Sequence, residues 1–416
     1  MLKSQSSCLH LDYILLAIRL EFQLSPSVKV KEISLTMEFS SSSLPTIRTN
    51  CCMCGSTDLS FYRRVRNVPV FMGVTTQERS RDRILDQEWQ ICDHCGLLQL
   101  RDLLPLDLLY SEGHHHEVVG ETWFSHHMEF AEFISKSSGK KVLEVGSAHG
   151  ALAKNLLNTC KFDSYTIVEP SPGTYPETCL VVRDYIENQS ELISAQDSII
   201  HSHLIEHLYE PAKFIKNLSD NLKTGSKMYV SFPNLEEMLQ NNGSNSLNFE
   251  HTYFLTPDQL EPLLNAHSFA LVRSKEFRSH SFFWELEKIS NPIMANLPDM
   301  RSKLLHFDAY WNEITDFVQR SNRLLRADPV PTYIFGAHTF SQTLISLGLD
   351  LSSIVGILDN STFKQGKRLY GTGFSVMSPF ELQNVGQVRV VLKASTYQDE
   401  IREQILGINP LTQVIE

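Results

Sequence analysis

The sequence lacks a long uninterrupted apolar segment. The longest apolar run near its start, Tyr13–Leu20, follows Asp12 and is interrupted by Arg19. Such a run is too short to cross a hydrocarbon core of about 30 Å. It also lacks the clean apolar core and small-residue cleavage site of a secretory signal peptide. We therefore expect a cytoplasmic protein without a membrane partner.

Positive charge is also scarce. The chain has 37 Lys and Arg against 48 Asp and Glu, which gives a formal net charge of −11. An acidic chain repels a phosphate backbone, so nucleic acid is not the expected partner. The basic run Arg63–Arg66 keeps open a zinc ribbon that binds nucleic acid. We favour a solvated face or a contact to the phosphate of a small substrate.

Length and composition indicate a soluble globular chain with more than one domain. The 416 residues are 42% hydrophobic and 20% charged, enough to form sizeable cores. We expect the N-terminal extension to be poorly ordered, or to reflect a misassigned upstream start codon. The predicted segments are an extension over 1–48, a zinc-binding domain over 49–110, a central domain over 111–290 and a C-terminal α/β domain over 291–416.

Half of the eight cysteines fall in two CxxCG motifs, Cys51–Gly55 and Cys92–Gly96. This spacing lets two thiolates reach one metal ion, and the glycine allows a tight turn. A disulfide framework is the alternative, which a cytosolic chain of this size disfavours. Cys52 or His94 could also replace a neighbouring ligand. Because four thiolates leave no open coordination position, we predict a structural Zn²⁺ site formed by Cys51, Cys54, Cys92 and Cys95.

A strand, a glycine turn and a helix are predicted around the segment VLEVGSAHG at 142–150. Gly146 permits a tight turn at the strand end, and Gly150 permits close approach of a ligand to the helix backbone. The next strand ends at Glu169, about 20 residues beyond the loop, where a carboxylate can hold ribose hydroxyls. The pattern predicts a nucleoside cofactor.

The loop reads ExGxxxG, so it lacks the diphosphate-binding GxGxxG pattern. A later strand is followed by Glu206-His207, and another strand covers 227–234. Together these features resemble the class I S-adenosylmethionine-dependent methyltransferases, which implies a doubly wound, Rossmann-like α/β domain. The alternatives are a buried strand carboxylate for Glu144 and a helix cap for Glu206 and His207. The resemblance assigns the cofactor to Glu144, Gly146, Ser147, Gly150, Glu169, Asp184 near the adenine and His203 near the methionine.

The order of the parts is more specific than any one motif. A CxxCG pair, a class I core and a further α/β unit resemble, from about Cys51 onward, the zinc-binding nucleotide-sugar C-methyltransferases of deoxysugar biosynthesis. Segment 248–254 matches their Glu-His pair followed by an aromatic residue. The resemblance implies a small-molecule nucleotide-sugar substrate, a smaller Rossmann-like C-terminal domain and a monomer or homodimer. It assigns substrate contacts to Asn248, Tyr253, Gly336, His338, Asp359 and Lys364.

C-methylation requires a base that removes a proton next to a ketone. His251 is the candidate, because a histidine pKa of about 6.5 suits proton abstraction near neutral pH. Glu250 would orient its ring, and the reaction needs no metal ion. The alternative for His251 is a core histidine whose ring bonds the backbone.

Two positions depart from the resemblance. Asn248 replaces a tyrosine, and the family's other active-site tyrosine falls near His115 unless Tyr110 takes that place. We therefore keep Tyr110 and His115 as catalytic candidates. The triple histidine 114–116 could form a second metal site, although a substrate contact or a solvated loop is favoured. Methylation of oxygen or nitrogen on a related sugar or polysaccharide precursor, or a catalytically silent binding protein, are the alternative functions.

Overall fold

The computed structural model describes residues 45–109, 121–147, 149–240, 248–294, 304–394 and 397–416. The first 44 residues of the predicted extension lie outside these ranges, as do Tyr110 and His115. None of the described helices combines the length and the apolar character needed to cross a bilayer.

The cysteine motifs belong to a small antiparallel sheet, which we call the cysteine module (residues 45–109). Its strand order is β2-β4-β5, and a separate two-stranded pair joins β1 to β6. The core centres on Trp89, of which 1% is exposed. The elements are β1 (Thr46–Ile47), β2 (Leu59–Pro69), β3 (Val74–Thr75), β4 (Ile84–Cys92), β5 (Leu98–Leu100), β6 (Asp102–Leu103) and α2 (Leu106–Leu109).

A seven-stranded sheet follows, with strand order β12-β13-β11-β10-β7-β8-β9. Strands β7 to β11 run parallel, whereas β13 is antiparallel to both β11 and β12. The strands are β7 (Lys141–Val145), β8 (Ser164–Val168), β9 (Leu180–Val182), β10 (Ser198–Ser202), β11 (Lys227–Pro233), β12 (Phe269–Phe277) and β13 (Ser281–Lys288). After its first residue, each of β7 and β8 is buried throughout, as expected of parallel strands covered on both faces.

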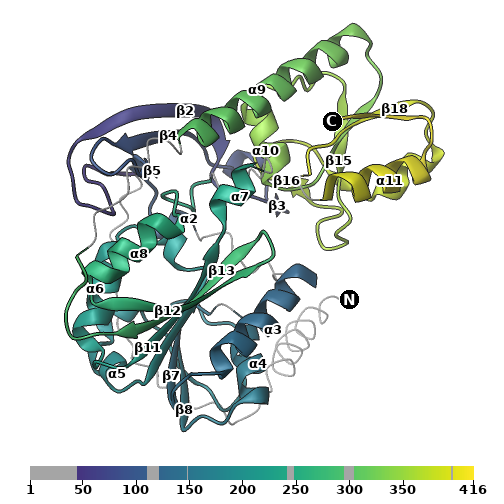
Figure 1. Ribbon diagram of the computed structural model, residues 1–416. Helices are drawn as coiled ribbons and strands as arrows, with labels where there is room; N and C mark the ends of the chain where they lie inside the picture. The colour runs from purple at the N-terminus through teal and green to yellow at the C-terminus, as the bar shows by residue number, and fades with distance from the viewer. Residues whose placement is uncertain (1–44, 110–120, 148, 241–247, 295–303, 395–396) are drawn as a thin grey trace, which may run out of the picture.

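Helices cover both faces of this sheet. In Figure 1, α3 and α4 lie on one side, and α5, α6 and α8 lie on the other. These helices carry the apolar stripes that the helical spacing predicts, such as Leu152 and Leu156 on α4. Their bounds are α3 (Glu121–Ser135), α4 (Ala151–Thr159), α5 (Ser190–Ser194), α6 (Pro211–Asn221), α7 (Leu235–Gln240) and α8 (Pro257–Ala266).

The strand order reverses between β7 and β10. From β7 the chain proceeds to β8 and β9 on one side, then returns to form β10 and β11 on the other. The connections after β7 and β10 therefore lead to opposite sides of the sheet, through α4 and α6 (Figure 1), and we refer to the carboxyl ends of these two strands as the crevice. Ligands of open parallel sheets bind at such a switch point.

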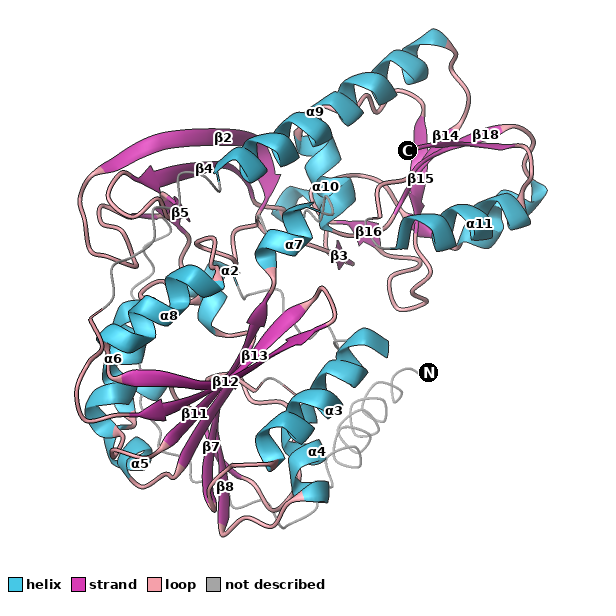
Figure 2. Ribbon diagram, viewed as in Figure 1, coloured by secondary structure: helices cyan, strands magenta, loops and turns pink. Residues whose placement is uncertain are grey.

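The C-terminal part forms a second, fully parallel sheet of order β17-β15-β14-β18-β19. Figure 2 shows α9 and α11 on opposite sides of it. The short strand β16 instead pairs with β3 of the cysteine module, and Gln342 on α10 donates a 2.9 Å hydrogen bond to the Phe71 carbonyl. The elements are α9 (Leu304–Ala327), β14 (Thr332–Phe335), α10 (Thr339–Ser346), β15 (Ile354–Leu358), β16 (Arg368–Leu369), β17 (Val376–Met377), β18 (Val388–Val391), α11 (Gln398–Ile408) and β19 (Thr412–Ile415).

Candidate functional site

The two CxxCG motifs fold into matching turns. In each, the glycine amide donates to the carbonyl of the first cysteine, at 2.9 Å in the Cys51 turn and 2.8 Å in the Cys92 turn. Gly55 and Gly96 adopt φ values of 75° and 71°. These are left-handed conformations that disfavour a residue with a Cβ atom. The local geometry thus explains why glycine follows each pair.

The four motif cysteines converge. The Sγ atoms of Cys51 and Cys95 lie 3.6 Å apart, as do those of Cys54 and Cys92, and all four lie within 4.8 Å of one another. A tetrahedral zinc ion with Zn–S bonds of about 2.3 Å requires neighbouring sulfurs about 3.8 Å apart, so the donor set fits zinc. The described cysteines form no disulfide. Cys52 is not in this cluster, and burial raises the pKa of its thiol to about 12.

The glycine loop begins at the switch point of the central sheet. Gly146 and Gly150 have φ values of 75° and 63°, and a Cβ atom on Gly150 would lie 2.7 Å from Cδ1 of Tyr175. The Tyr175 hydroxyl donates a 2.5 Å hydrogen bond to the Ser147 carbonyl. Both glycines are therefore required by the backbone, and the loop presents a cradle that larger residues would fill.

Glu144 lies inside β7, where only 3% of the residue is exposed. Its Oε2 atom accepts a 2.6 Å hydrogen bond from the hydroxyl of Tyr165 on the neighbouring strand β8. Burial raises the pKa of Glu144, and hydrogen bonds from Tyr165 and Ser147 partly offset that effect. Its position combines the two roles considered for it, because it is both a buried strand carboxylate and the acid that precedes the glycine loop.

The other two predicted cofactor acids follow the next strands at the same edge. Glu169 directly follows β8 and accepts a 2.8 Å hydrogen bond from the Ser171 amide. Asp184 follows β9, and its carboxylate accepts hydrogen bonds of 2.7 to 2.8 Å from the Tyr185 amide and from the side chains of Asn188 and Gln189. Asp184 therefore also anchors the turn that follows β9.

His203 stands at the end of β10, on the other side of the crevice. Its φ of 49° is unusual for a non-glycine residue. Burial lowers the pKa of His203 well below its ordinary value, so the neutral ring is favoured at neutral pH. The Trp123 ring of α3 lies with its centroid 4.7 Å from the His203 ring. The rings of His126 and His280 also contact His203, and the ring of His127 contacts Trp123.

An acid–base cluster lies next to His203. One ligand-type atom each from Glu206, His207 and His251 lies within 4.8 Å of the other two. Nδ1 of His207 is 3.9 Å from a carboxylate oxygen of Glu250, and the rings of His207 and His251 have centroids 4.9 Å apart. Two carboxylates and two imidazoles therefore meet beside the crevice. A 2-His-1-carboxylate set can also hold a divalent metal ion.

Asn248 and Tyr253, predicted to contact substrate, make hydrogen bonds to backbone groups. The Asn248 Oδ1 atom accepts the amides of Glu250 and His251 at 2.7 and 2.9 Å. The Tyr253 hydroxyl, on a fully buried side chain, donates to the Ile205 carbonyl. Both side chains therefore shape the segment that carries the Glu-His pair.

The predicted nucleotide contacts also come together at one sheet edge. Gly336, with φ of 98°, directly follows β14, and His338 occupies the N-cap position of α10. Asp359 follows β15, and its Oδ2 atom accepts a 2.8 Å hydrogen bond from the Ala337 amide and lies 3.0 Å from Lys364 Nζ. The acid thus holds the glycine turn closed.

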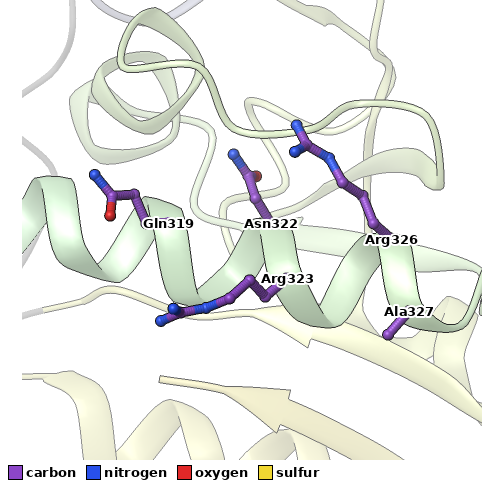
Figure 3. Close-up of a pocket in the computed structure, with 5 residues that line it drawn as sticks. All are labelled: Gln319, Asn322, Arg323, Arg326 and Ala327. Atoms are coloured by element: carbon purple, nitrogen blue, oxygen red, sulfur yellow. The ribbon is translucent and has the colours of Figure 1, made fainter.

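A hollow of about 530 Å³ lies elsewhere, along α9 (Figure 3). Its lining residues all come from the second half of this one helix, and Arg326 among them is paired with Asp350 at 2.6 Å. None of the predicted site residues contributes to this hollow. The residues that line it are Gln319, Asn322, Arg323, Arg326 and Ala327. The sheet edge, where acids and bases converge, is the stronger candidate.

Sequence analysis missed Trp123, His126, His280 and Ser281. Trp123 and His126 lie on α3, His280 lies in the turn between β12 and β13, and Ser281 begins β13. All four are far in sequence from His203, which they contact. The concentration of histidines was a usable signal, since α3 carries His126 and His127 in succession. Their convergence on His203 depends on strand order.

Residues 116–274 match the methyltransferase domain family. The matched segment includes the crevice between β7 and β10, Glu144, the glycine loop and His251. This segment of the chain is a methyltransferase domain. The predicted Rossmann-like methyltransferase fold is confirmed for this part of the chain. No curated protein sequence matches the chain.

Several solved methyltransferases are similar in fold. Magnesium protoporphyrin IX methyltransferase from Synechocystis PCC 6803, solved with bound SAH, is 13% identical over 40% of this chain and 84% of its own, with a TM-score of 0.31. An N-methyltransferase from Bradyrhizobium japonicum WM9 is 11% identical over 41% and 97%, with a TM-score of 0.29. An S-adenosylmethionine-dependent methyltransferase from Mesorhizobium loti is 10% identical over 38% and 95%, with a TM-score of 0.32.

Proposed function

We propose that this methyltransferase methylates a carbon next to the ketone of a nucleotide-activated keto sugar. The observation that carries the proposal is the cluster of Glu206, His207, Glu250 and His251 at the carboxyl edge of the sheet, beside the methyl donor's crevice. Proton abstraction from carbon needs a base in a partly desolvated site, and this cluster supplies one. The resemblance of the domain order to sugar C-methyltransferases supports the same assignment.

S-adenosylmethionine supplies an electrophilic methyl group on a cationic sulfur. Glu169 is positioned to accept the ribose hydroxyls, and Asp184 to reach the adenine, because each follows a neighbouring strand at the same edge. Gly146, Ser147 and Gly150 allow the cofactor to approach the backbone closely. Glu144, in the strand that precedes the loop, stabilises the loop, and His203 lines the site of the cofactor's methionine end.

His251 removes the proton, and the resulting enolate carbon attacks the methyl group. Asn248 fixes the backbone of the Glu-His pair by accepting two amides. Glu206 is the fully buried carboxylate of the cluster, and it supports the imidazolium that forms on His251. A carboxylate oxygen of Glu250 lies 3.9 Å from Nδ1 of His207 and adds negative charge to the cluster.

The remaining domains serve structure and substrate binding in this proposal. Zn²⁺ held by the four motif cysteines would stabilise the cysteine module, because its tetrahedral shell has no open position. The nucleotide would bind at the reversal of strand order between β14 and β18. Gly336, His338 and Lys364 lie at this edge, and Asp359 holds the turn that shapes it.

The test is deuterium incorporation without methyl donor. The enzyme is incubated in D₂O with thymidine diphosphate-4-keto-6-deoxyglucose, and deuterium at the carbons next to the ketone is followed by NMR. Wild-type enzyme should catalyse incorporation, and His251→Ala should slow it by about 100-fold or more. The matched control is His306→Ala, because His306 is half-exposed and outside the site. Methylation of the sugar by wild-type enzyme without deuterium exchange next to the ketone would contradict the proposed reaction. An unchanged rate of deuterium exchange in His251→Ala would contradict the proposed base.

A further inference from the structure

A continuous chain of polar side chains leads from the acid–base cluster toward the surface. Nδ1 of His203 lies 3.0 Å from a carboxylate oxygen of Glu206, and Nε2 of the same ring lies 3.0 Å from Oγ of Ser281. Oγ of Ser281 in turn lies 2.6 Å from Nδ1 of His280. One ion-pair contact of 3.0 Å and two hydrogen bonds therefore join Glu206 to His280.

This row of polar side chains is buried at the Glu206 end and reaches the surface at the His280 end. Glu206 and Ser281 have no exposed surface, whereas His280 is half-buried in a turn whose other residues, Arg278 and Ser279, are exposed. The Trp123 ring packs against the middle and the outer end, with its centroid 4.7 Å from the His203 ring and 4.9 Å from the His280 ring. Trp123 thus shields the links from bulk water.

C-methylation creates a demand for such a path. The substrate loses one proton for every methyl group it gains, and the sulfonium becomes a neutral thioether. The proton remains on the base until it leaves, and bound substrate covers the base from solvent. Glu206 has a carboxylate oxygen within 4.8 Å of a ring nitrogen of His251, which places it where it can accept this proton. Catalytic contacts of this kind often tighten when substrate binds.

We propose that Glu206, His203, Ser281 and His280 form a proton relay that clears the proposed base, His251, after each proton abstraction. The inference rests on the proposed C-methylation. The proton passes from the ring of His251 to the carboxylate of Glu206. The carboxyl proton of Glu206 then moves to Nδ1 of His203. At the same time, the proton on Nε2 of His203 moves to Oγ of Ser281, and the hydroxyl proton of Ser281 moves to Nδ1 of His280. His280 releases a proton to solvent from Nε2, which leaves Glu206 as a carboxylate and both imidazoles neutral. Before the next turnover, His203 returns its proton from Nδ1 to Nε2, His280 from Nδ1 to Nε2, and the Ser281 hydroxyl rotates back.

The surroundings of Glu206 suit a transient proton carrier. Burial raises the pKa of this carboxyl, and the charged groups that oppose the shift are the imidazoles of His207 and His251. Within the described residues, Glu206 forms its ion pair with His203 and not with a lysine or arginine. A carboxylate permanently paired with a guanidinium would hold its charge too firmly to take up a proton.

The decisive variant is Ser281→Ala, which removes one hydroxyl and leaves every titratable group in place. Ser231→Ala is the matched control, because Ser231 is also fully buried and its Oγ lies 2.8 Å from Nε2 of His126, outside the relay. Both variants are compared with wild type using thymidine diphosphate-4-keto-6-deoxyglucose as the probe. The measurements are single-turnover methyl transfer, steady-state kcat and deuterium incorporation in D₂O.

The relay predicts a specific pattern in Ser281→Ala. Single-turnover methyl transfer should stay within about twofold of wild type, while kcat and deuterium incorporation fall about tenfold or more because the abstracted proton returns to the substrate. Ser281→Thr, which restores the hydroxyl, and added imidazole buffer should recover both rates. Ser231→Ala should resemble wild type in all three measurements.

Two results would overturn the relay. One is unchanged kcat and incorporation in Ser281→Ala, and the other is an equal loss of single-turnover and steady-state rates, which marks a structural role. Failure of the proposed function itself gives a different result, because wild-type enzyme then incorporates no deuterium. Melting curves of Ser281→Ala and Ser281→Thr exclude unfolding as the cause.

Discussion

The amide of Leu100 donates a 2.8 Å hydrogen bond to the carbonyl of Thr252, one residue after His251. The amide of Phe254 returns a 2.8 Å hydrogen bond to the carbonyl of Leu98, so strand β5 of the cysteine module runs beside the segment that follows the proposed base. The Cys92–Cys95 turn directly precedes β5. The cysteine module is therefore connected through two backbone hydrogen bonds to the candidate active site.

Loss of the metal should accordingly reach the active site. Wild-type protein is expected to contain about one zinc ion per chain, and Cys95→Ser to lose it because three thiolates do not complete the shell. We expect deuterium exchange into substrate to fall about tenfold as the His251 segment loosens, while cofactor affinity changes little. Elemental analysis and the exchange assay measure the two effects. Cys160→Ser is the control, since Cys160 lies outside the cluster. Wild-type protein that contains no zinc would contradict the proposed zinc site.

Arg48 provides a second link between the same two parts. Its guanidinium donates 2.8 Å hydrogen bonds to the carbonyls of Thr252 and Tyr209, and only 7% of the residue is exposed. Because Arg48→Ala leaves two buried carbonyls without these donors, we expect the free energy of unfolding to fall by about 3 kcal/mol with zinc retained. Arg64→Ala, which removes an exposed pair with Glu88, should cost less than about 1 kcal/mol. Urea denaturation separates the two, and equal losses would contradict the assignment.

Local spacing predicted the parts of the site that depend on local backbone. Gly55 and Gly96 adopt the turns expected after each cysteine pair, and Glu169 follows its strand as the distance from the glycine loop requires. Contacts between distant segments were beyond that reasoning. Tyr165 reaches Glu144 only because β7 and β8 are neighbours in register.

The Glu-His pair illustrates the same limit. Adjacency in sequence predicted that Glu250 orients His251, and the structure adds a contact of the Glu250 carboxylate to His207, from the loop after β10. The order of β10 and β11 in the sheet brings these loops together, and no pattern within either loop specifies that meeting. Ser281 and His280 were missed for the same reason, because a hairpin after β11 carries them to His203.

Glu144 should make stability depend on pH. Burial raises its pKa in the folded state above the ordinary value of 4.5, so its contribution is fully present below about pH 4.5 and is lost as pH rises through the raised value. Glu144→Gln keeps an oxygen that can accept the Tyr165 hydroxyl but does not ionise. The variant should therefore gain stability relative to wild type between pH 4.5 and 8. Urea denaturation across this range measures the difference, and a constant offset would show that Glu144 does not titrate there.

Gly150 offers the sharpest test of the cofactor loop. Gly150→Ala should strain the backbone at a φ of 63° and push its Cβ atom to 2.7 Å from the ring of Tyr175, which itself bonds the Ser147 carbonyl. We expect the Kd for S-adenosylhomocysteine to rise about tenfold or more, which corresponds to about 1.4 kcal/mol, as measured by calorimetry. Gly225→Ala is the matched control, because Gly225 has a φ of 88° but no heavy atom within 4 Å of its added Cβ and no place in the crevice. Both variants carry the cost of a left-handed alanine, about 1–2 kcal/mol, so both should melt earlier than wild type. Only Gly150→Ala should lose affinity, because only there does the added carbon displace the loop that the cofactor must approach.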